Sequence, residues 1–431
     1  MKKFLAAVLA LVMVASLCAC GGKNNTTATP TPEPIYEGDM TVSMWCIATE
    51  KDSNRASYEK AIADLKNMHK NLTLNWEAFE NQTYKDKIKT AVQGDSMPDI
   101  FFTWSCAFLG DFVKTGRVYC LDDAYKEFAN SLDEKMCRNT IYDGHKYGVP
   151  LTLNVVVLFA NMDILKAAGW DDVPQTYDDL LKCCDDIKAK TGKIPFGCAG
   201  GETWCVTEYL EPLMVKNMGG EKLDNVFQAK DTWGNDKIAD SVEKLQGMID
   251  KGYFDPAAET LSNGEVQQKF IAGDYAFYQN GSWNCADFAA AKDGEFIKSV
   301  KVTEFPVVDS SASKLGELIG GPSDTLAVAA SAKHASTVAK YTFELGQLIC
   351  KYGYLAGSGL PAWKVDYPTD NINELTKKVS EIVNNASYLV LFGDTAMSAD
   401  TKDIYLEAVA KVFSKQITGA NFIAGLKSAL Q

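Results

Sequence analysis

The sequence has 431 residues, of which 46% are hydrophobic and 11% aromatic, and its formal net charge is −13. This apolar content is typical of a folded protein and excludes an intrinsically disordered chain. The negative charge argues against nucleic acid or an anionic membrane surface as a partner. Because single hydrophobic cores stop growing at roughly 250–300 residues, we expect two lobes.

The start of the chain predicts export. Lys2 and Lys3 precede an uncharged apolar run over residues 4–17. This run is shorter than the ~20 residues that a membrane-spanning helix needs. A basic start, a short apolar run and small residues at its end are typical of a signal peptide, which we place at residues 1–19.

The end of the run, Leu17-Cys18-Ala19-Cys20, resembles the lipobox of bacterial lipoproteins. It departs from that pattern at Cys18, where the family usually carries Ala, Ser or Thr. The resemblance implies that Cys20 is lipidated, and a diacylated cysteine supplies the two chains that stable anchoring needs. We therefore expect a protein at the extracytoplasmic face of the bacterial cell membrane, which it contacts through the lipid anchor only. The alternative is an ordinary signal followed by an incidental cysteine.

After Cys20 the chain is rich in Asn, Thr, Pro and Gly up to residue 38, so residues 20–38 are predicted to be a lipidated cysteine with a flexible linker. From there the pattern alternates between strands and helices that have one apolar face. Strands are predicted at 41–45, 72–76, 99–102, 149–159, 194–197 and 276–278. This alternation predicts an α/β fold with two doubly wound lobes built on parallel sheets.

In a parallel sheet of this kind, ligands bind beyond the carboxyl ends of the strands. Trp45 and Glu50 follow the first predicted strand, and Trp104 and Ser105 follow the third. We expect these residues to share one edge and to contribute to a ligand site. Asn154 is a lone amide in an apolar strand. Such an amide costs about 1–3 kcal/mol when it is unpaired, so it needs either a ligand or partners within the protein.

Twelve cysteines in an exported chain raise the question of disulfides. Their spacing is unlike a disulfide framework, and most have apolar neighbours. We interpret them as buried free thiols, which behave as small hydrophobic residues, and disulfides are the alternative. There is no Cys-x-x-Cys, and His69, His145 and His334 are scattered, so the sequence predicts no metal site.

An exported, Trp-rich protein could also be a glycosidase, which needs two carboxylates ~5–9.5 Å apart across the scissile bond. Glu202 with Glu50 or Glu80 could supply such a pair. The sequence contains neither Gly-x-Ser-x-Gly nor His-Glu-x-x-His. The segment from Gly247 to Gly252 has the glycine spacing of a phosphate loop, but it continues with Tyr-Phe rather than the required Lys-Ser or Lys-Thr. We expect a protein that is not an enzyme, with no catalytic residue and no cofactor.

Five segments occur in an order that resembles family 1 extracellular solute-binding proteins of ABC sugar importers, which are similar in plan to maltose-binding proteins. They cover residues 97–104, 147–150, 161–163, 273–277 and 280–283. The resemblance implies two α/β lobes that are joined by a hinge and close like a clamshell on a ligand cleft between them.

The resemblance also implies that the chain crosses between the lobes three times. We expect these crossings near Leu153, near Thr303 and between Leu355 and Pro361. The N-terminal lobe would then comprise residues 39–153 and 305–358. The C-terminal lobe would comprise residues 154–304 and 359–431.

In function, the resemblance implies a monomer that captures a carbohydrate, expected to be an oligosaccharide, and passes it to ABC permease subunits with a separate ATPase. A glycosidase, or a binding protein for another solute, is the alternative. The ligand-binding residues that follow from the resemblance and from the strand ends are Trp283, Trp104, Trp204, Glu202, Asn154, Glu50, Trp45, Ser105, Asn280 and Gly321.

The three expected sugar-stacking residues are Trp283, Trp204 and Trp104, and the alternative for each is a tryptophan of the core. The chain departs from maltose-binding proteins just after Trp104. There, Ala107 and Phe108 replace an aspartate and an arginine. Asn154 likewise replaces a carboxylate. The site therefore carries fewer charges, and its sugar need not be a maltodextrin.

Overall fold

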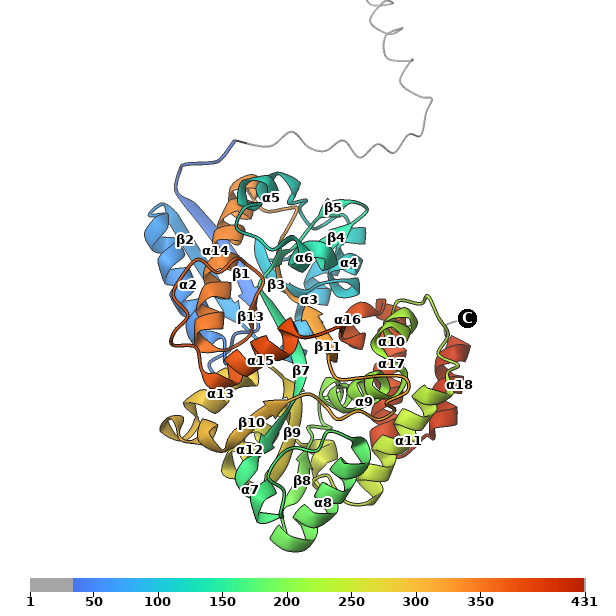
Figure 1. Ribbon diagram of the computed structural model, residues 1–431. Helices are drawn as coiled ribbons and strands as arrows, with labels where there is room; N and C mark the ends of the chain where they lie inside the picture. Colours follow the sequence, from blue (N-terminus) through green and yellow to red (C-terminus); the bar gives the residue numbers. More distant parts are fainter. Residues whose placement is uncertain (1–33, 430–431) are drawn as a thin grey trace, which may run out of the picture. The chain divides into compact units, whose positions relative to one another are not determined.

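The computed structural model describes residues 34–429 and contains two large sheets with helices packed against them (Figure 1). In the first sheet the strand order is β2-β1-β3-β12-β6. We call this sheet and its helices the first lobe. Its strands are β1 (Met40–Cys46), β2 (Leu72–Ala78), β3 (Ile100–Trp104), β6 (Val149–Pro150) and β12 (Asp324–Val328). The predicted parallel pairing of β1, β2 and β3 is confirmed, whereas β12 is antiparallel to both β3 and β6.

The helices of the first lobe form where the apolar spacing predicts them. In α2, Tyr58, Ile62 and Leu65 form a buried stripe. The carboxylate of Glu80 caps α3 by accepting from the backbone N–H of Gln82 at 3.0 Å, so Glu80 starts a helix. The helices of this lobe are α2 (Arg55–Met68), α3 (Asn81–Gly94), α4 (Ala107–Lys114), α5 (Asp122–Phe128), α6 (Glu134–Cys137) and α14 (Ala335–Ala356), and a hairpin joins β4 (Ile141–Tyr142) to β5 (His145–Lys146).

The second sheet has the strand order β14-β11-β7-β9-β8, with β10 and β13 also paired to β7. We call this sheet and its helices the second lobe. Every residue of β7 is buried, as expected of a central strand. The sheet is mixed: β9, β10, β11 and β13 are antiparallel to β7, whereas β8 is parallel to β9 and β14 is parallel to β11. The strands are β7 (Thr152–Asn161), β8 (Ile194–Gly197), β9 (Tyr275–Gly281), β10 (Val300–Thr303), β11 (Glu317–Pro322), β13 (Leu360–Pro361) and β14 (Tyr388–Val390).

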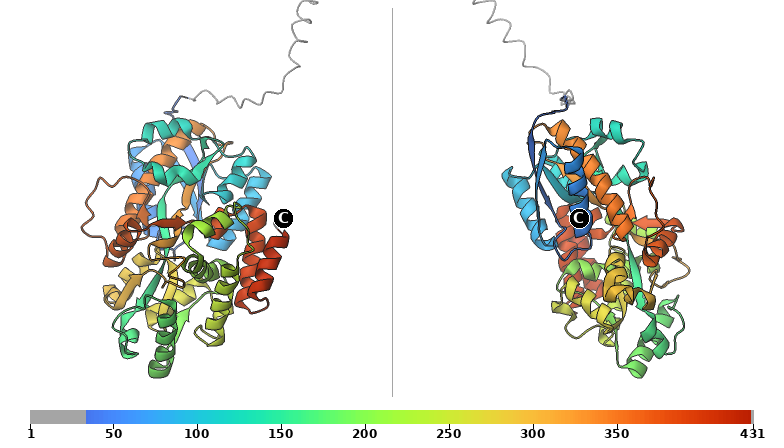
Figure 2. Two further views of the ribbon diagram at one scale, coloured as in Figure 1. Left: turned by 45° about the vertical axis from the view of Figure 1, so that its right-hand side comes forward. Right: turned by 90° about the vertical axis from the view of Figure 1, so that its left-hand side faces the viewer.

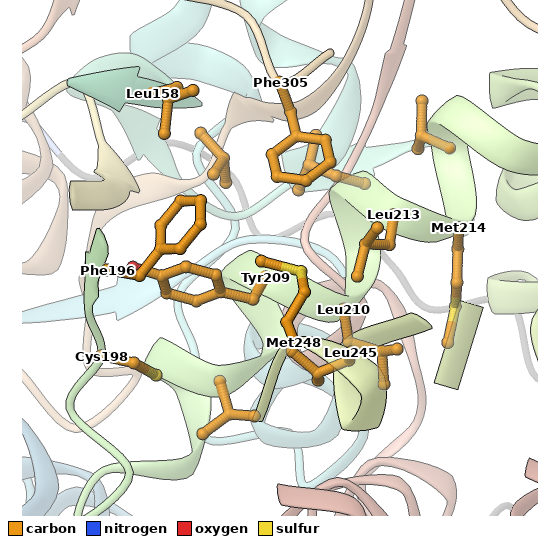
Figure 3. Packing of buried hydrophobic residues seen from close by; sticks show 14 of the residues in the cluster. Leu158, Phe196, Cys198, Tyr209, Leu210, Leu213, Met214, Leu245, Met248 and Phe305 are labelled. Carbon is orange, nitrogen blue, oxygen red and sulfur yellow. The ribbon is translucent and has the colours of Figure 1, made fainter. Parts of the chain in front are cut away.

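The second lobe has a buried cluster on each face of its sheet. One lies between the sheet and α9 (Figure 3), and the other includes Phe159, Phe270 and Phe288. Phe196 of β8 meets the ring of Tyr209 edge-on at 5.9 Å. In Figure 2, α17 and α18 appear in red. α17 packs against α9, and α18 packs against α11. The helices are α7 (Met162–Ala167), α8 (Tyr177–Thr191), α9 (Thr203–Met218), α10 (Gly220–Phe227), α11 (Asp236–Asp250), α12 (Asn263–Ala272), α13 (Asn284–Ala290), α15 (Glu374–Asn384), α16 (Gly393–Ala396), α17 (Ala399–Phe413) and α18 (Gly419–Ala429).

Three segments connect the lobes and lie side by side, and we call them the hinge. The chain passes from β6 to β7 at Leu151, from β11 to β12 at Ser323, and from α14 to β13 at residues 357–359. The backbone N–H of Leu151 donates to the carbonyl of Asp324 at 2.9 Å, which joins the first two segments. The strands also approach closely, since a Cβ at Gly320 would lie 2.3 Å from the carbonyl oxygen of Asn154. Glycine is therefore required at that position.

The predicted crossing near Thr303 is wrong. Phe305 packs in the core of the second lobe, and Glu317–Pro322 pairs with β7 and β14 of the second sheet. Residues 305–322 therefore stay with the second lobe, and the crossing follows at Ser323. Residues 320–322 are Gly-Gly-Pro, a composition typical of loops. In the structure they are the end of β11, where the close approach of β7 requires glycine at position 320.

All ten cysteines of residues 34–429 are free, and eight of them are buried, so the interpretation as buried thiols is confirmed for this part of the chain. The last linker residues contact the first lobe: the ring of Tyr36 stacks on His334 at 3.9 Å, and Asn71 donates to the carbonyl of Gly38 at 2.8 Å. The signal peptide, Cys20 and the linker up to residue 33 lie outside the described residues. Within the described range, no helix is long and apolar enough to span a membrane.

Candidate ligand-binding site

Three aromatic rings of the second lobe lie together. Trp283 follows β9, and its ring covers Gly281, where a Cβ would lie 2.2 Å from the ring. The centroid of Trp204, at the start of α9, is 6.0 Å from that of Trp283, and the centroid of Phe392, just before α16, is 6.3 Å from it. All three side chains are partly exposed. We call Trp204, Trp283 and Phe392 the aromatic cluster.

Trp104 at the end of β3 is the corresponding aromatic residue of the first lobe. Its ring packs edge-on against Phe102 and Phe108 at 5.0 and 5.1 Å, and it remains partly exposed. Lys85 of α3 places its Nζ 4.8 Å from the centroid of the Trp104 ring. The same Nζ lies 3.7 Å from Oδ2 of Asp394, two residues after Phe392. An ion pair therefore connects the surroundings of Trp104 to the part of the second lobe that carries the aromatic cluster.

Of the other candidates of the first lobe, Glu50 follows β1, whereas Trp45 is the second-last residue of that strand. Trp45 is partly exposed, with the ring of Phe79 at 5.7 Å and Nζ of Lys87 at 4.3 Å from its centroid. Glu50 is exposed in the turn that follows. Both of these ring contacts come from its own lobe, so they do not join Trp45 to the aromatic cluster.

Glu202 positions its neighbours with both carboxylate oxygens. Oε2 accepts from the indole N–H of Trp204 at 2.9 Å, and Oε1 accepts from the backbone N–H of Asn263 at 2.7 Å. The first bond fixes the Trp204 ring, and the second joins the start of α9 to the start of α12. Glu202 and Trp204, both expected ligand contacts, are therefore bonded to each other, and the carboxylate orients the ring.

Asn154 is part of the hinge. Its Oδ1 accepts from the hydroxyl of Ser282 at 3.0 Å, and its Nδ2 donates to Thr152 Oγ1 at 3.2 Å and to Asp324 Oδ2 at 3.4 Å. Thr152 also donates to Asp324 at 3.0 Å. Burial raises the pKa of Asp324 to about 6, although these donors oppose the shift. The partners of Asn154 are therefore protein side chains from two of the three hinge segments and from the end of β9.

The remaining expected residues, Ser105, Asn280 and Gly321, are buried. Ser105 Oγ donates to the carbonyl of Pro322 at 3.0 Å and so fixes the second hinge segment. Asn280 donates to Asn263 Oδ1 at 3.1 Å and accepts from Asn284 Nδ2 at 2.9 Å. Gly321 pairs with Asn154 in the β11–β7 ladder. All three residues are thus paired within the protein.

Sequence reasoning missed several residues around the aromatic cluster. Phe392 and Asp394 follow the short strand β14, so the strand-end argument would have found them had β14 been recognised. Glu211 of α9 anchors their turn, because its carboxylate accepts from the backbone N–H of Gly393 at 3.2 Å and from the hydroxyl of Tyr405 at 2.9 Å. Burial, followed by the charge of Asp394, raises the pKa of Glu211 to about 8.

Glu208 lies one turn after Trp204 and is 2% exposed, and neither of its carboxylate oxygens has a hydrogen-bond partner among residues 34–429. Burial raises its pKa well above the usual range. The side-chain amide of Gln279 in β9 is likewise buried and unpaired within that range. Gln279 precedes Gly281 by two positions, so it shares the sheet face that Trp283 covers.

Residues 48–341 match the family model of bacterial extracellular solute-binding proteins, and the chain belongs to this family. The multiple sugar-binding protein of Streptococcus mutans is 24% identical over 260 residues, which are 59% of this chain and 60% of that protein. The diacetylchitobiose-binding protein DasA of Streptomyces coelicolor is 25% identical over 342 residues, which are 77% and 75% of the two chains.

Solved structures agree with the family assignment. One, from a study of xylan utilisation by Caldanaerobius polysaccharolyticus, is similar with a TM-score of 0.86 and 26% identity, over 91% of this chain and all of that one. A chitin oligosaccharide binding protein is similar with a TM-score of 0.82 and 22% identity, over 90% and 98% of the chains. These comparisons confirm both the resemblance and the two-lobe α/β fold.

Proposed function

We propose that this protein binds an oligosaccharide between its two lobes and delivers it to an ABC importer. The family assignment supports capture of an extracellular solute. The names of the relatives support a sugar, since two of them bind multiple sugars and diacetylchitobiose. The observation that carries the proposal is the aromatic cluster, which is partly exposed and whose Trp204 ring is fixed by Glu202.

The cluster suits a sugar for a physical reason. One face of a pyranose ring presents C–H groups that pack against an aromatic ring, while its hydroxyls require polar partners. Trp204 and Trp283 supply the rings in the second lobe, and Trp104 supplies one in the first. The Lys85–Asp394 pair lies next to Trp104 and supplies charged donors and acceptors. A ligand that touches both sides binds only the closed arrangement, so binding and closure are coupled.

In the cell, the protein is held at the outer face of the membrane. Cys20 carries the lipid anchor, and the linker holds the folded part away from the membrane. The protein acts as a monomer, and ATP hydrolysis belongs to a separate subunit of the importer. It is not an enzyme. In support, the carboxylate of Glu202, a candidate for glycosidase chemistry, is already bound to Trp204 and Asn263.

A panel of mono- and oligosaccharides tests this function, with thermal stability and cleavage products measured in the same samples. A ligand at 100 times its Kd stabilises a protein by ~2.7 kcal/mol, which a melting curve detects. We expect at least one neutral oligosaccharide to raise the melting temperature and to be recovered intact. Cleavage products would indicate a glycosidase. Stabilisation only by amino acids, peptides or ions would indicate another solute.

A further inference from the structure

Cys120, Asp122 and His145 form a cluster in the first lobe, away from the residues of the proposed sugar site. Cys120 and Asp122 lie at the start of α5, and His145 begins β5, whose hairpin lies next to α5 (Figure 1). One side-chain atom from each residue, a sulfur, an oxygen and a nitrogen, lies within 4.8 Å of the other two. His145 Nδ1 is 2.7 Å from Asp122 Oδ2.

The backbone holds the two segments in this position. The N–H of Leu121 donates to the carbonyl of Lys146 at 2.7 Å. In the opposite direction, the N–H of Lys146 donates to Asp122 Oδ1 at 2.9 Å. The second carboxylate oxygen of Asp122 is thereby directed toward His145. The fold therefore holds Asp122 and His145 together before any ion binds.

The donor set matches a transition metal of the zinc class. Zinc binds thiolate sulfur at ~2.3 Å and imidazole nitrogen or carboxylate oxygen at ~2.0–2.2 Å in a tetrahedral arrangement. Such bonds place ligand atoms about 3.3–3.8 Å apart, so a small widening of the His145–Asp122 contact admits the ion. The side chains of His145 and Asp122 are 42% and 24% exposed, which leaves a path for a hydrated ion and room for a water ligand.

We propose that Cys120 Sγ, Asp122 Oδ2 and His145 Nδ1 bind one divalent ion of the zinc class, with water as the fourth ligand. On binding, the ion loses waters, the Cys120 thiol releases its proton to solvent, and no electron is transferred. The bound ion joins the β4–β5 hairpin to α5. Sequence spacing gave no sign of this site because Asp122 and His145 are 23 residues apart, and only the folded hairpin brings them together.

Cobalt(II) tests the site, because thiolate ligation to cobalt produces a charge-transfer absorption that carboxylate and imidazole ligands alone do not. The reduced protein from Gly21 onward, which lacks the thiol of Cys20, is titrated with Co²⁺ and then with Zn²⁺. We expect one equivalent of Co²⁺ to produce the band and Zn²⁺ to remove it. The band should be lost in both Cys120→Ser and His145→Gln.

Cys106→Ser is the matched control, because Cys106 is the other partly exposed thiol of residues 34–429. This variant should retain the band. In the unmodified protein, Zn²⁺ should protect Cys120 from iodoacetamide, as measured by peptide mass spectrometry, so the test does not depend on the folding of a variant. The proposal is overturned if the unmodified protein shows no band, if the band survives in Cys120→Ser, or if Cys120 is alkylated equally with and without Zn²⁺. None of these readouts involves sugar.

Discussion

Nζ of Lys85, in the first lobe, lies 3.7 Å from Oδ2 of Asp394, in the second lobe, and the two side chains are only 17% and 19% exposed. The pair lies next to the ring of Trp104. Because these charges belong to different lobes, they attract only when the lobes are close. The pair therefore favours the closed arrangement, in which rings of both lobes can contact one ligand.

Lys85→Met should weaken sugar binding moderately. An ion pair that is partly exposed to solvent contributes about 1 kcal/mol or less, which corresponds to roughly a fivefold increase in Kd or less. The ligand-free variant should also show a larger radius of gyration in small-angle scattering. Lys66→Met, at an exposed position of α2, is the control and should change neither quantity. A loss of affinity beyond about twentyfold would show instead that Lys85 binds the sugar directly.

Asn154→Ala distinguishes a hinge residue from a ligand-binding residue. Removing this amide deletes its hydrogen bonds to Ser282, Thr152 and Asp324 in a buried place, which costs about 1–3 kcal/mol of folding stability. We expect urea denaturation to show that loss while the Kd of the folded protein, measured by calorimetry, changes less than about threefold. If the Kd rises tenfold or more at unchanged stability, Asn154 contacts the ligand as the family resemblance implied.

Glu211 makes stability depend on pH. Its pKa is about 8 in the folded protein and roughly 4.3 in an unfolded chain. The folded state therefore binds the proton more tightly, and this contribution to stability falls as pH rises from about 4.5 to about 8. Glu211→Gln stays neutral and can still accept from Gly393 and Tyr405, so its stability should depend less on pH in that range.

Urea denaturation at pH 5, 6, 7 and 8 measures the effect, and the slope that the substitution removes should approach ~1.4 kcal/mol per pH unit. Glu221→Gln, at an exposed position of α10, should leave the slope unchanged. If Glu211→Gln and the unmodified protein lose stability in parallel, Glu211 does not titrate as the structure indicates.

Much of the fold could be predicted because each element has a local cause. Tyr58, Ile62 and Leu65 mark α2 by their helical spacing, and the first three parallel strands follow from short apolar runs. The position of residues 305–322 could not be predicted in the same way. It depends on β11 pairing with β7, a contact between segments far apart in sequence. The glycines that permit this approach are also typical of loops, so the sequence does not reveal the strand.

In the candidate site, too, local features could be predicted and long-range contacts could not. Trp204 and Trp283 were found because they follow strands or glycine-rich loops, which are local features. Whether a polar residue near them is free to bind a ligand depends on its partners in the folded protein. Glu202 and Asn154 look alike in sequence as isolated polar groups, and the fold gives both of them internal partners. Lys85 was missed because only the packing of two lobes brings it to Asp394.

Cys20→Ala tests the proposed anchor. Without this cysteine no lipid can be attached, so we expect the protein to leave the membrane fraction as shed or unprocessed protein. The sugar Kd of the released protein should match that of the unmodified protein, because the linker precedes the folded part. Cys120→Ser is a control and should remain in the membrane fraction. If the Cys20→Ala protein keeps its signal peptide but otherwise stays in the membrane fraction like the unmodified protein, the proposed lipid anchor is contradicted.

Calorimetric titration of Trp283→Ala measures whether the aromatic cluster binds the sugar. Loss of a stacking ring at a binding hot spot costs ~2 kcal/mol or more, so the Kd should rise about thirtyfold or more. Trp233→Ala is the matched control, because Trp233 is 5% exposed and packs on Phe227 and Tyr405. It should lose ~3–5 kcal/mol of stability while its folded fraction binds normally. If Trp283→Ala is well folded and binds the sugar as tightly as the unmodified protein, Trp283 is not part of the sugar site and the aromatic cluster does not bind the sugar as proposed.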